Sequence, residues 1–190
     1  MDELKAPGFR GEFQIANAAA VLALLDAAGL LQQVDASLVN KVLPDVSLLG
    51  RMQTLHIDDV EWLLDVAHNA AAAEVLAAAL ASTATPGEIF AIVGILDDKD
   101  VAGIIAPLAR CVDRWIAIRA DSPRAVPADE LARQISMLTD KACLVEDSPA
   151  GAIEFARRRA SENDRILVTG SFFTVGPVLS QLMTLSKAKS

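Results

Sequence analysis

Residues 89–96, IFAIVGIL, form a nearly continuous apolar run that passes directly into the polar sequence DDKD at residues 97–100. Shorter runs of the same kind follow at residues 114–118 (RWIAI) and 165–169 (RILVT). Such runs are typical of strands that are buried on both faces, as in a parallel sheet covered by helices. The run at 89–96 therefore predicts a central strand of an α/β sheet.

Helical patterns separate the apolar runs, so strand and helix are expected to alternate along the chain. The expected strands cover residues 88–95, 114–118, 142–145 and 165–169, and the expected helices cover residues 70–82, 101–110, 128–138, 150–160 and 175–185. Repeated strand–helix units predict a doubly wound α/β fold: a Rossmann-like, mostly parallel sheet flanked by helices.

An antiparallel hairpin is expected at one edge of this sheet. Residues 52–57 and 60–66 have strand character, and the pair Asp58-Asp59 between them is suited to a tight turn. Because the second of these segments leads into the first helix of the alternating pattern, the hairpin adds an antiparallel edge strand to the parallel sheet.

The N-terminal part of the chain is predicted to be helical. Residues 14–28 carry apolar groups at helical spacing, which predicts an amphipathic helix, and Gly29 suits its C-terminal end. A second short helix is expected over residues 36–42. We therefore divide the chain into a helical extension, residues 1–47, and an α/β domain, residues 48–190, because the extension is too short to form a core by itself.

Composition and charge exclude several classes of protein. Of 190 residues, 53% are hydrophobic and 22% charged, which excludes intrinsic disorder. The net charge of −8 opposes binding to nucleic acid or to anionic membranes. No apolar stretch reaches the ~20 residues of a membrane span, and residues 1–14 lack a basic segment followed by an apolar one. We therefore expect no nucleic-acid or membrane partner and a cytoplasmic location.

Polar segments follow the expected strands at the positions where α/β sheets bind ligands, beyond the carboxyl ends of the strands. Asp65, His68 and Asn69 follow one strand and precede a helix, so they can meet a polyol or phosphate beside the positive helix end. The alternative is structural: Asn69 caps the helix, and Asp65 and His68 complete the strand end.

Two further segments of this kind follow later strands. Lys99, in DDKD, is a cation suited to a carboxylate or phosphate; the alternative is a solvated loop in which Asp98 or Asp100 caps the next helix. Ser171 belongs to TGSFFT at residues 169–174, a sequence with hydroxyls and a glycine suited to an anion, or to a helix cap.

Motifs for other chemistries are absent. The sequence contains neither GxxxxGK[ST] nor GxGxxG nor GxSxG, and its two histidines are His56 and His68. A complete phosphate loop, a hydrolase nucleophile and a zinc site are therefore not indicated. Cys111 and Cys143 lack CxxC spacing, so we assign them no chemistry.

Taken in order, these segments resemble the C-terminal part of the bacterial dihydrofolate synthase/folylpolyglutamate synthases, a family within the Mur ligase superfamily. The segments that carry the resemblance are NAA at residues 17–19, GRMQ at 50–53, LDVAHN at 64–69, GILDDKD at 94–100, SPRA at 122–125 and VTGSFFTV at 168–175. Leu49 and Ala70 stand where family members usually have proline, which changes loop stiffness and leaves the functional groups in place.

The resemblance implies a two-step reaction. Such enzymes use ATP to phosphorylate a carboxylate of dihydropteroate or a folate, and the amine of L-glutamate then attacks the acyl phosphate. Their N-terminal ATPase domain carries the phosphate loop and the Mg²⁺ ligands. The resemblance thus implies that residues 1–47 end that domain, that the ATPase domain is this chain's partner, that no metal ligand lies in this chain, and that the chain alone is inactive.

The resemblance also implies residues that bind the nucleotide. Asn17 would contact the adenine side of ATP, Arg51 the phosphates and Asp65 the ribose hydroxyls. Asn69, in the same motif as Asp65, is grouped with these nucleotide-binding residues.

Three other positions are expected to act on the reacting groups. His68 would lie near the phosphates, and Lys99 and Ser171 would hold the incoming glutamate. His68 and Lys99 are the candidate catalytic residues, because cations there would offset charge developing on the acyl phosphate.

Two rival interpretations remain open. One is a non-catalytic binding module that keeps the ligase fold and docks to a partner through residues 1–47. The other is a phosphoacceptor receiver domain, suggested by Asp97-Asp98 and Thr169; it is weaker because the acceptor aspartate and final lysine of such domains do not align with the strand ends.

Overall fold

The computed structural model describes residues 4–8, 13–83 and 85–187, which form two compact units, residues 1–52 and 53–190. The sequence considered for a leader, residues 1–14, lies partly outside the described residues.

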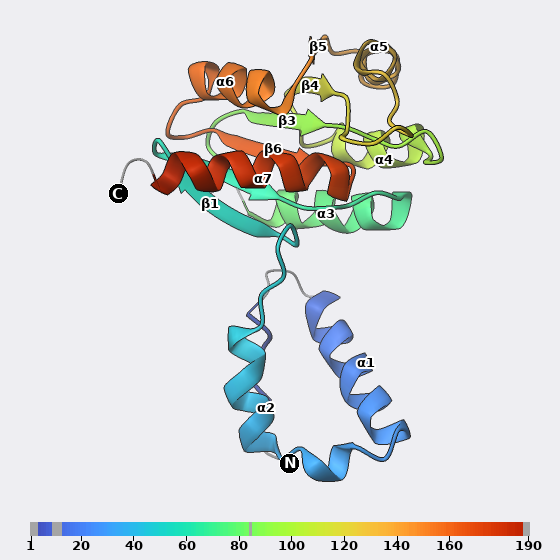
Figure 1. The fold of residues 1–190 in the computed structure, drawn as a ribbon, viewed down its shortest axis with the longest axis vertical. Coiled ribbons are helices and arrows are strands. Elements are labelled where there is room, and N and C mark those ends of the chain that lie inside the picture. The colour runs from blue at the N-terminus through green and yellow to red at the C-terminus, as the bar shows by residue number, and fades with distance from the viewer. Residues whose placement is uncertain (1–3, 9–12, 84, 188–190) are drawn as a thin grey trace. The chain divides into compact units, whose positions relative to one another are not determined.

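The first unit is helical, as the sequence predicts (Figure 1). It contains α1 (Phe13–Ala27), η1 (Leu31–Gln33), α2 (Ala36–Val42) and η2 (Leu43–Asp45). Gly29 has a φ of +69°, a left-handed conformation typical of a helix end. The Asp35 side chain caps α2 by accepting a hydrogen bond of 2.7 Å from the Leu38 amide.

The amphipathic character expected of the first helix is not realised as a buried apolar face. Gln14 is the one residue of α1 that is buried, whereas Ile15 is 57% exposed and Leu24 is 69% exposed. The physical reason is size: a unit of two short helices offers too little surface to cover all of the apolar side chains that α1 carries.

The second unit contains a six-stranded sheet in the order β1-β2-β6-β3-β4-β5. Its strands are β1 (Gln53–Ile57), β2 (Val60–Leu64), β3 (Ile89–Val93), β4 (Arg114–Ile118), β5 (Cys143–Glu146) and β6 (Arg165–Thr169). β1 and β2 pair antiparallel, and the other neighbours pair parallel. The turn between β1 and β2 has positive φ at Asp58 and Asp59, as tight hairpins require. The predicted fold class and edge hairpin are confirmed.

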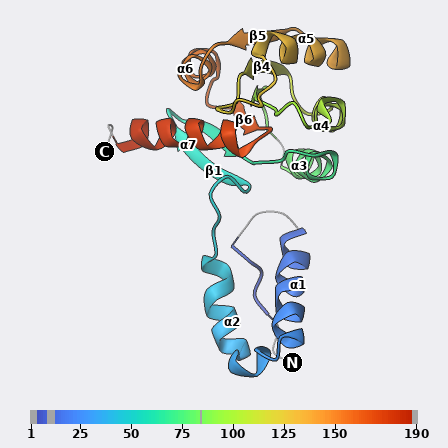
Figure 2. The same cartoon turned by 45° about the vertical axis from the view of Figure 1, so that its right-hand side comes forward.

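Helices cover both faces of this sheet (Figures 1 and 2). They are α3 (Ala70–Ser82), α4 (Val101–Leu108), α5 (Ala128–Thr139), α6 (Pro149–Arg159) and α7 (Phe172–Lys187). α3, α4 and α5 pack side by side on one face, and α6 and α7 pack together on the other. Beneath α6 and α7 lies a buried apolar core that includes Trp62, Phe90 and Ile166.

The last helix begins three residues earlier than the sequence predicts. We expected the last helix to begin at residue 175, whereas α7 begins at Phe172. Ser171 explains the difference, because its Oγ accepts a hydrogen bond of 3.1 Å from the Phe173 amide and so satisfies a free N–H of the first turn. The TGSFFT sequence is therefore half loop and half helix.

Candidate functional site

The order of the strands creates a crevice at the carboxyl end of β6. β2 and β3 are the neighbours of β6 and lead to α3 and α4 on one face of the sheet. β6 leads to α7 on the opposite face. Loops that diverge in this way leave a crevice between them, where doubly wound sheets bind their ligands.

Hydrogen bonds join the three loops at this crevice. The Gly170 amide donates to the carbonyl oxygen of Ala67 over 3.1 Å, which links the ends of β6 and β2. The Thr174 hydroxyl donates to the carbonyl oxygen of Gly94 over 2.7 Å, which links the start of α7 to the end of β3. The loops are therefore held in place before any ligand arrives.

Asp65 lies at the end of β2 and is 7% exposed. Its amide donates to the Val168 carbonyl oxygen on β6 over 3.0 Å, and its Oδ1 accepts a hydrogen bond of 2.8 Å from the Ala67 amide. These bonds fix the carboxylate at the crevice. An acceptor held in this way is suited to hydroxyl donors such as those of a sugar.

His68 and Asn69 follow on the same loop. Nδ1 of His68 lies 2.8 Å from the Val66 carbonyl oxygen, which can only accept, so Nδ1 carries the proton. The His68 ring lies 6.4 Å from that of Phe172, at the start of α7. Asn69 caps α3 by accepting from the Ala72 amide over 2.8 Å, the structural role that we weighed for it.

Lys99 lies on the loop between β3 and α4, next to two acidic residues with distinct roles. Asp100 caps α4 by accepting from the Gly103 amide over 2.9 Å. The Oδ2 atom of Asp98 lies 2.9 Å from Nζ of Lys99 and 3.5 Å from NH1 of Arg124. The hydrogen bond from Lys99 holds the pKa of the Asp98 carboxyl below its usual range, with Arg124 contributing.

Ser171 is 4% exposed, between β6 and α7. Because its Oγ accepts from the Phe173 amide, its hydroxyl proton is directed elsewhere and can be donated. Ser171 follows Gly170, whose φ of +106° is favourable only for glycine. A β-carbon at position 170 would lie 2.6 Å from the carbonyl oxygen of Gly94.

Asn17 and Arg51, the other two predicted nucleotide-binding residues, belong to the first unit. Asn17 is exposed on α1, and its Nδ2 donates to Oε1 of Gln14 over 3.0 Å. Arg51 is half-buried in the bend before β1, directly after Gly50, which has a φ of +68°. The structure thus gathers Asp65, His68, Asn69, Lys99 and Ser171 in the second unit and leaves these two in the first.

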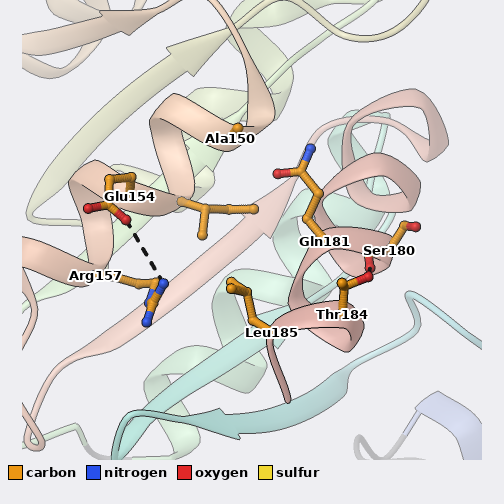
Figure 3. Close-up of a pocket in the computed structure, with 8 residues that line it drawn as sticks. Ala150, Glu154, Arg157, Ser180, Gln181, Thr184 and Leu185 are labelled. Carbon is orange, nitrogen blue, oxygen red and sulfur yellow. Dashed lines mark hydrogen bonds and ion pairs between the residues drawn. The ribbon is translucent and has the colours of Figure 1, made fainter. Parts of the chain in front are cut away.

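Cavities occur in several places in the second unit. One of about 530 Å³ adjoins Lys99 between α4 and α5; Asp97, Val126 and Glu130 also line it. A second, of about 350 Å³, lies between α6 and α7 (Figure 3), and no predicted site residue lines it. A third, of about 510 Å³, is lined by Arg119 and Asp121 after β4 and by Pro177 of α7, and it also contains no predicted site residue.

Charged side chains in the second cavity already have partners. Its Arg157 is paired with Glu154 at 3.9 Å and donates through Nε to Asp58 over 2.9 Å. Of the three cavities, the one beside Lys99 is the one that a predicted site residue lines.

Within residues 4–8, 13–83 and 85–187, no group of three or more His, Cys, Asp or Glu side chains could hold a metal ion. In the same ranges, no helix has both the length and the apolar character needed to cross a membrane.

The protein-family model described as "Mur ligase, glutamate ligase domain" matches residues 50–172, more than half of the chain. The chain belongs to the Mur ligase family. The matched range contains Arg51 and every candidate residue of the second unit, and Asn17 lies outside it.

Named relatives of this Mur ligase domain point to one branch of the family. The chain is 35% identical over 163 residues to the dihydrofolate synthase/folylpolyglutamate synthase of Escherichia coli K12, covering 86% of the chain and 37% of that protein. This Mur ligase domain therefore spans well under half the length of that relative. The resemblance seen in the sequence motifs is confirmed.

Solved structures agree with the sequence relatives. The structure of E. coli FolC in complex with DHPP and ADP matches with a TM-score of 0.82 and 30% identity, covering all of this chain and 42% of that one. A bifunctional folylpolyglutamate synthase/dihydrofolate synthase with Mn, AMPPNP and L-glutamate bound matches with a TM-score of 0.80 and 32% identity, covering 96% of this chain and 42% of that one. The Mur ligase C-terminal fold is thus shown.

Two residues at the crevice were not among the predicted site residues of this Mur ligase domain. Arg124 belongs to the SPRA motif but was given no role, and its pairing with Asp98 joins loops 26 residues apart. Phe172 was expected in a loop, and its contact with His68 depends on the early start of α7. The SPRA motif was the available signal for Arg124; for Phe172 no sequence signal stood out.

Proposed function

We propose that this chain forms one wall of the nucleotide and glutamate sites of an ATP-dependent ligase that adds L-glutamate to dihydropteroate, to folates or to both, through an acyl phosphate. The observation that carries the proposal is the crevice at β6, where hydrogen bonds join the loops that hold Asp65, Lys99 and Ser171. The names of the relatives and the ligands in their structures support it.

Asp65 is the residue that we assign to the ribose hydroxyls, because a buried carboxylate fixed by backbone bonds is a strong acceptor. Asn17 is assigned to the adenine side and Arg51 to the phosphates. Asn69, whose oxygen caps α3, still has its amide N–H groups for the nucleotide.

His68, Lys99 and Ser171 are assigned to the reacting groups. Nε2 of His68 is the ring nitrogen left for the phosphates, since Nδ1 is engaged by a carbonyl oxygen. The Lys99 ammonium and the Ser171 hydroxyl are assigned to the carboxylates of L-glutamate. The Lys99 ammonium, and the His68 ring when both of its nitrogens are protonated, would offset charge on the acyl phosphate. Closure against an ATPase domain would exclude the water that hydrolyses it.

The ATPase domain is proposed to supply what this chain does not. We assign the phosphate loop and the Mg²⁺ ligands to it, since the described residues offer no group able to hold a metal. Residues 1–47 are proposed to be the end of that domain. The chain alone is then inactive as a ligase, and the cytoplasm, which holds ATP, is the proposed compartment.

A titration of the labelled chain with ADP tests the nucleotide part of the proposal. We expect NMR shifts clustered at Arg51 and residues 65–69. Asp65→Ala should weaken ADP binding tenfold or more. The control Asp129→Ala, which removes an exposed carboxylate at the start of α5, should leave ADP binding unchanged. Unchanged ADP binding in Asp65→Ala, or turnover of glutamate by the chain alone, would contradict the proposal.

A non-catalytic docking module is the second candidate function. Exposed apolar side chains in the first unit favour it, among them Leu24 at 69% and Leu49 at 75%. It predicts that the chain takes up no ADP at any concentration. A monodisperse monomer in sedimentation would count against docking through this unit.

A further inference from the structure

We propose that Asp98 is a positioning residue that holds Lys99 and Arg124 together as a two-cation site for the carboxylates of L-glutamate. This inference rests on the proposed function and deepens it. It adds Arg124 to the glutamate site and gives Asp98 a task that is distinct from binding the ligand.

The backbone places Lys99 and Arg124 on a fixed support. The loops after β3 and β4 form an isolated antiparallel bridge between Leu96 and Ala125. On one side of the bridge the Asp97 amide donates to the Arg124 carbonyl oxygen over 2.7 Å. On the other side the Val126 amide donates to the Ile95 carbonyl oxygen over 2.9 Å. The two loops therefore act as one short ribbon, which we call the β3–β4 loop ribbon.

Apolar packing reinforces this ribbon. Leu96, Ala120 and Ala125 form a small buried cluster of their own beneath it, with exposed fractions of 6%, 2% and 7%. Ordinary surface ion pairs must order two flexible segments before they form. Here the segments are already ordered, so the positions of the side-chain stems of Lys99 and Arg124 are set by the fold.

Asp98 contacts both cations through a single oxygen. Its Oδ2 lies 2.9 Å from Nζ of Lys99 and 3.5 Å from NH1 of Arg124. Two like charges this close repel each other, and an anion between them offsets the repulsion. The lowered pKa of Asp98 ensures that this anion is ionised at neutral pH.

Sharing one oxygen leaves donors available for a ligand. An ammonium has three N–H donors and a guanidinium has five, so each cation retains most of its donors after contacting Asp98. Guanidinium groups bind carboxylates through two parallel hydrogen bonds, and an ammonium binds them as a compact point charge. The arrangement is suited to a ligand with two carboxylates.

The adjoining cavity indicates where the rest of such a ligand would lie. Lys99 lines it, together with the apolar side chains of Val126 and Pro127 and the carboxylates of Asp97, Asp100 and Glu130. The apolar residues suit the methylene groups of glutamate. The three carboxylates suit its amino group, while its own carboxylates would face the two cations. L-Glutamate thus matches the chemistry of this site better than an amino acid with one carboxylate.

The test compares L-glutamate with L-glutamine, which has nearly the same shape and one carboxylate fewer. We expect the unsubstituted chain to prefer glutamate in NMR titrations. Asp98→Asn should weaken glutamate binding about three- to fivefold, the scale of an exposed ion pair, and leave glutamine binding unchanged. Asp98→Glu should restore part of the preference, and Asp121→Asn, an exposed acid at the same edge of the sheet, should have no effect.

The opposite result has a clear physical meaning. If Asp98 only blocked the cations, Asp98→Asn would strengthen glutamate binding, because the site would gain net positive charge. Stronger or unchanged binding in Asp98→Asn would overturn the inference and leave the proposed function intact. If the unsubstituted chain bound no glutamate, the glutamate part of the proposed function would fail as well.

A second pair of variants tests Arg124 directly. Lys99→Ala and Arg124→Ala should each reduce the preference for glutamate over glutamine. When either substitution is combined with Asp98→Asn, the loss of preference should be smaller than the sum of the two separate losses, because all three side chains form one unit. Additive effects would contradict the shared site.

Discussion

The hydroxyl of Thr174 donates a hydrogen bond of 2.7 Å to the carbonyl oxygen of Gly94, and Thr174 is fully buried. The bond joins residues 80 positions apart in the chain. It fixes the start of α7, and with it Ser171, relative to the end of β3, which leads to Lys99. Stability and site geometry therefore depend on the same contact.

Replacing Thr174 with valine tests this contact. Valine keeps the shape and leaves the Gly94 carbonyl oxygen buried without this partner, so we expect the free energy of unfolding to fall by about 1–3 kcal/mol. Urea unfolding followed by the fluorescence of Trp62 and Trp115, both buried in the second unit, measures it. The control Thr184→Val removes an exposed hydroxyl in the same helix and should change stability by less than about 0.5 kcal/mol.

Gly170 is predicted to be intolerant of a side chain. Gly170→Ala combines a φ of +106° with a β-carbon 2.6 Å from the Gly94 carbonyl oxygen, so we expect a loss of about 2–4 kcal/mol in the free energy of unfolding. Gly176→Ala is the matched control, because nothing lies within 4 Å of its β-carbon in α7. It should stabilise the helix by about 0.5–1 kcal/mol. Equal effects of the two substitutions would refute this explanation.

Glu61 is predicted to stabilise the sheet through Arg165, its neighbour in the β2–β6 register. The Arg165 side chain is 8% exposed and donates to Glu61 through Nε. Glu61→Gln leaves a buried guanidinium without its counter-charge, so we expect the free energy of unfolding, measured with urea, to fall by about 1–3 kcal/mol. Glu88→Gln, which disrupts the exposed pair with Arg114, should cost less. A larger loss at Glu88 would contradict the burial argument.

Cys143 is predicted to be an unreactive thiol. Burial raises its pKa to about 12, and only the thiolate reacts with alkylating agents. At pH 8 about one thiol in ten thousand is then ionised, so alkylation should be on the order of a thousandfold slower than for an ordinary cysteine.

The pH dependence of the alkylation rate tests the direction of the pKa shift. Because the pKa is raised, the alkylation rate of Cys143 should increase about tenfold per pH unit between pH 7 and 9.5 without levelling. The Cys111→Ser variant isolates this thiol, since Cys111 is the other free cysteine. Labelling in denaturing urea should level near pH 8.5. A plateau near that pH in the folded chain would show that the half-buried Cys143 thiol is not desolvated.

Much of the fold was predictable because a sheet covered on both faces requires apolar residues at successive positions. The runs at β4 and β6 were therefore assigned with their observed bounds. The start of α7 was harder to predict, because a serine followed by two phenylalanines carries no strong helix signal. It depends on one hydrogen bond that the Phe173 amide donates to the Ser171 side chain.

The candidate site, like the fold, has parts that the sequence predicts and parts that it does not. Asp65, His68 and Lys99 were predicted as site residues because polar residues directly after apolar strands stand out in the sequence. The link from Asp98 to Arg124 was not found, because it depends on a bridge between Leu96 and Ala125 that no local pattern specifies. Pairings between loops follow from which strands become neighbours.

The β3–β4 loop ribbon constrains how this domain can be engineered. Since the Leu96–Ala125 bridge sets the register between the two loops, an insertion in either loop would shift Lys99 relative to Arg124. Grafting one loop from a homologue would then pair mismatched partners. A transplant from a homologue should exchange both loops together, as a single cassette.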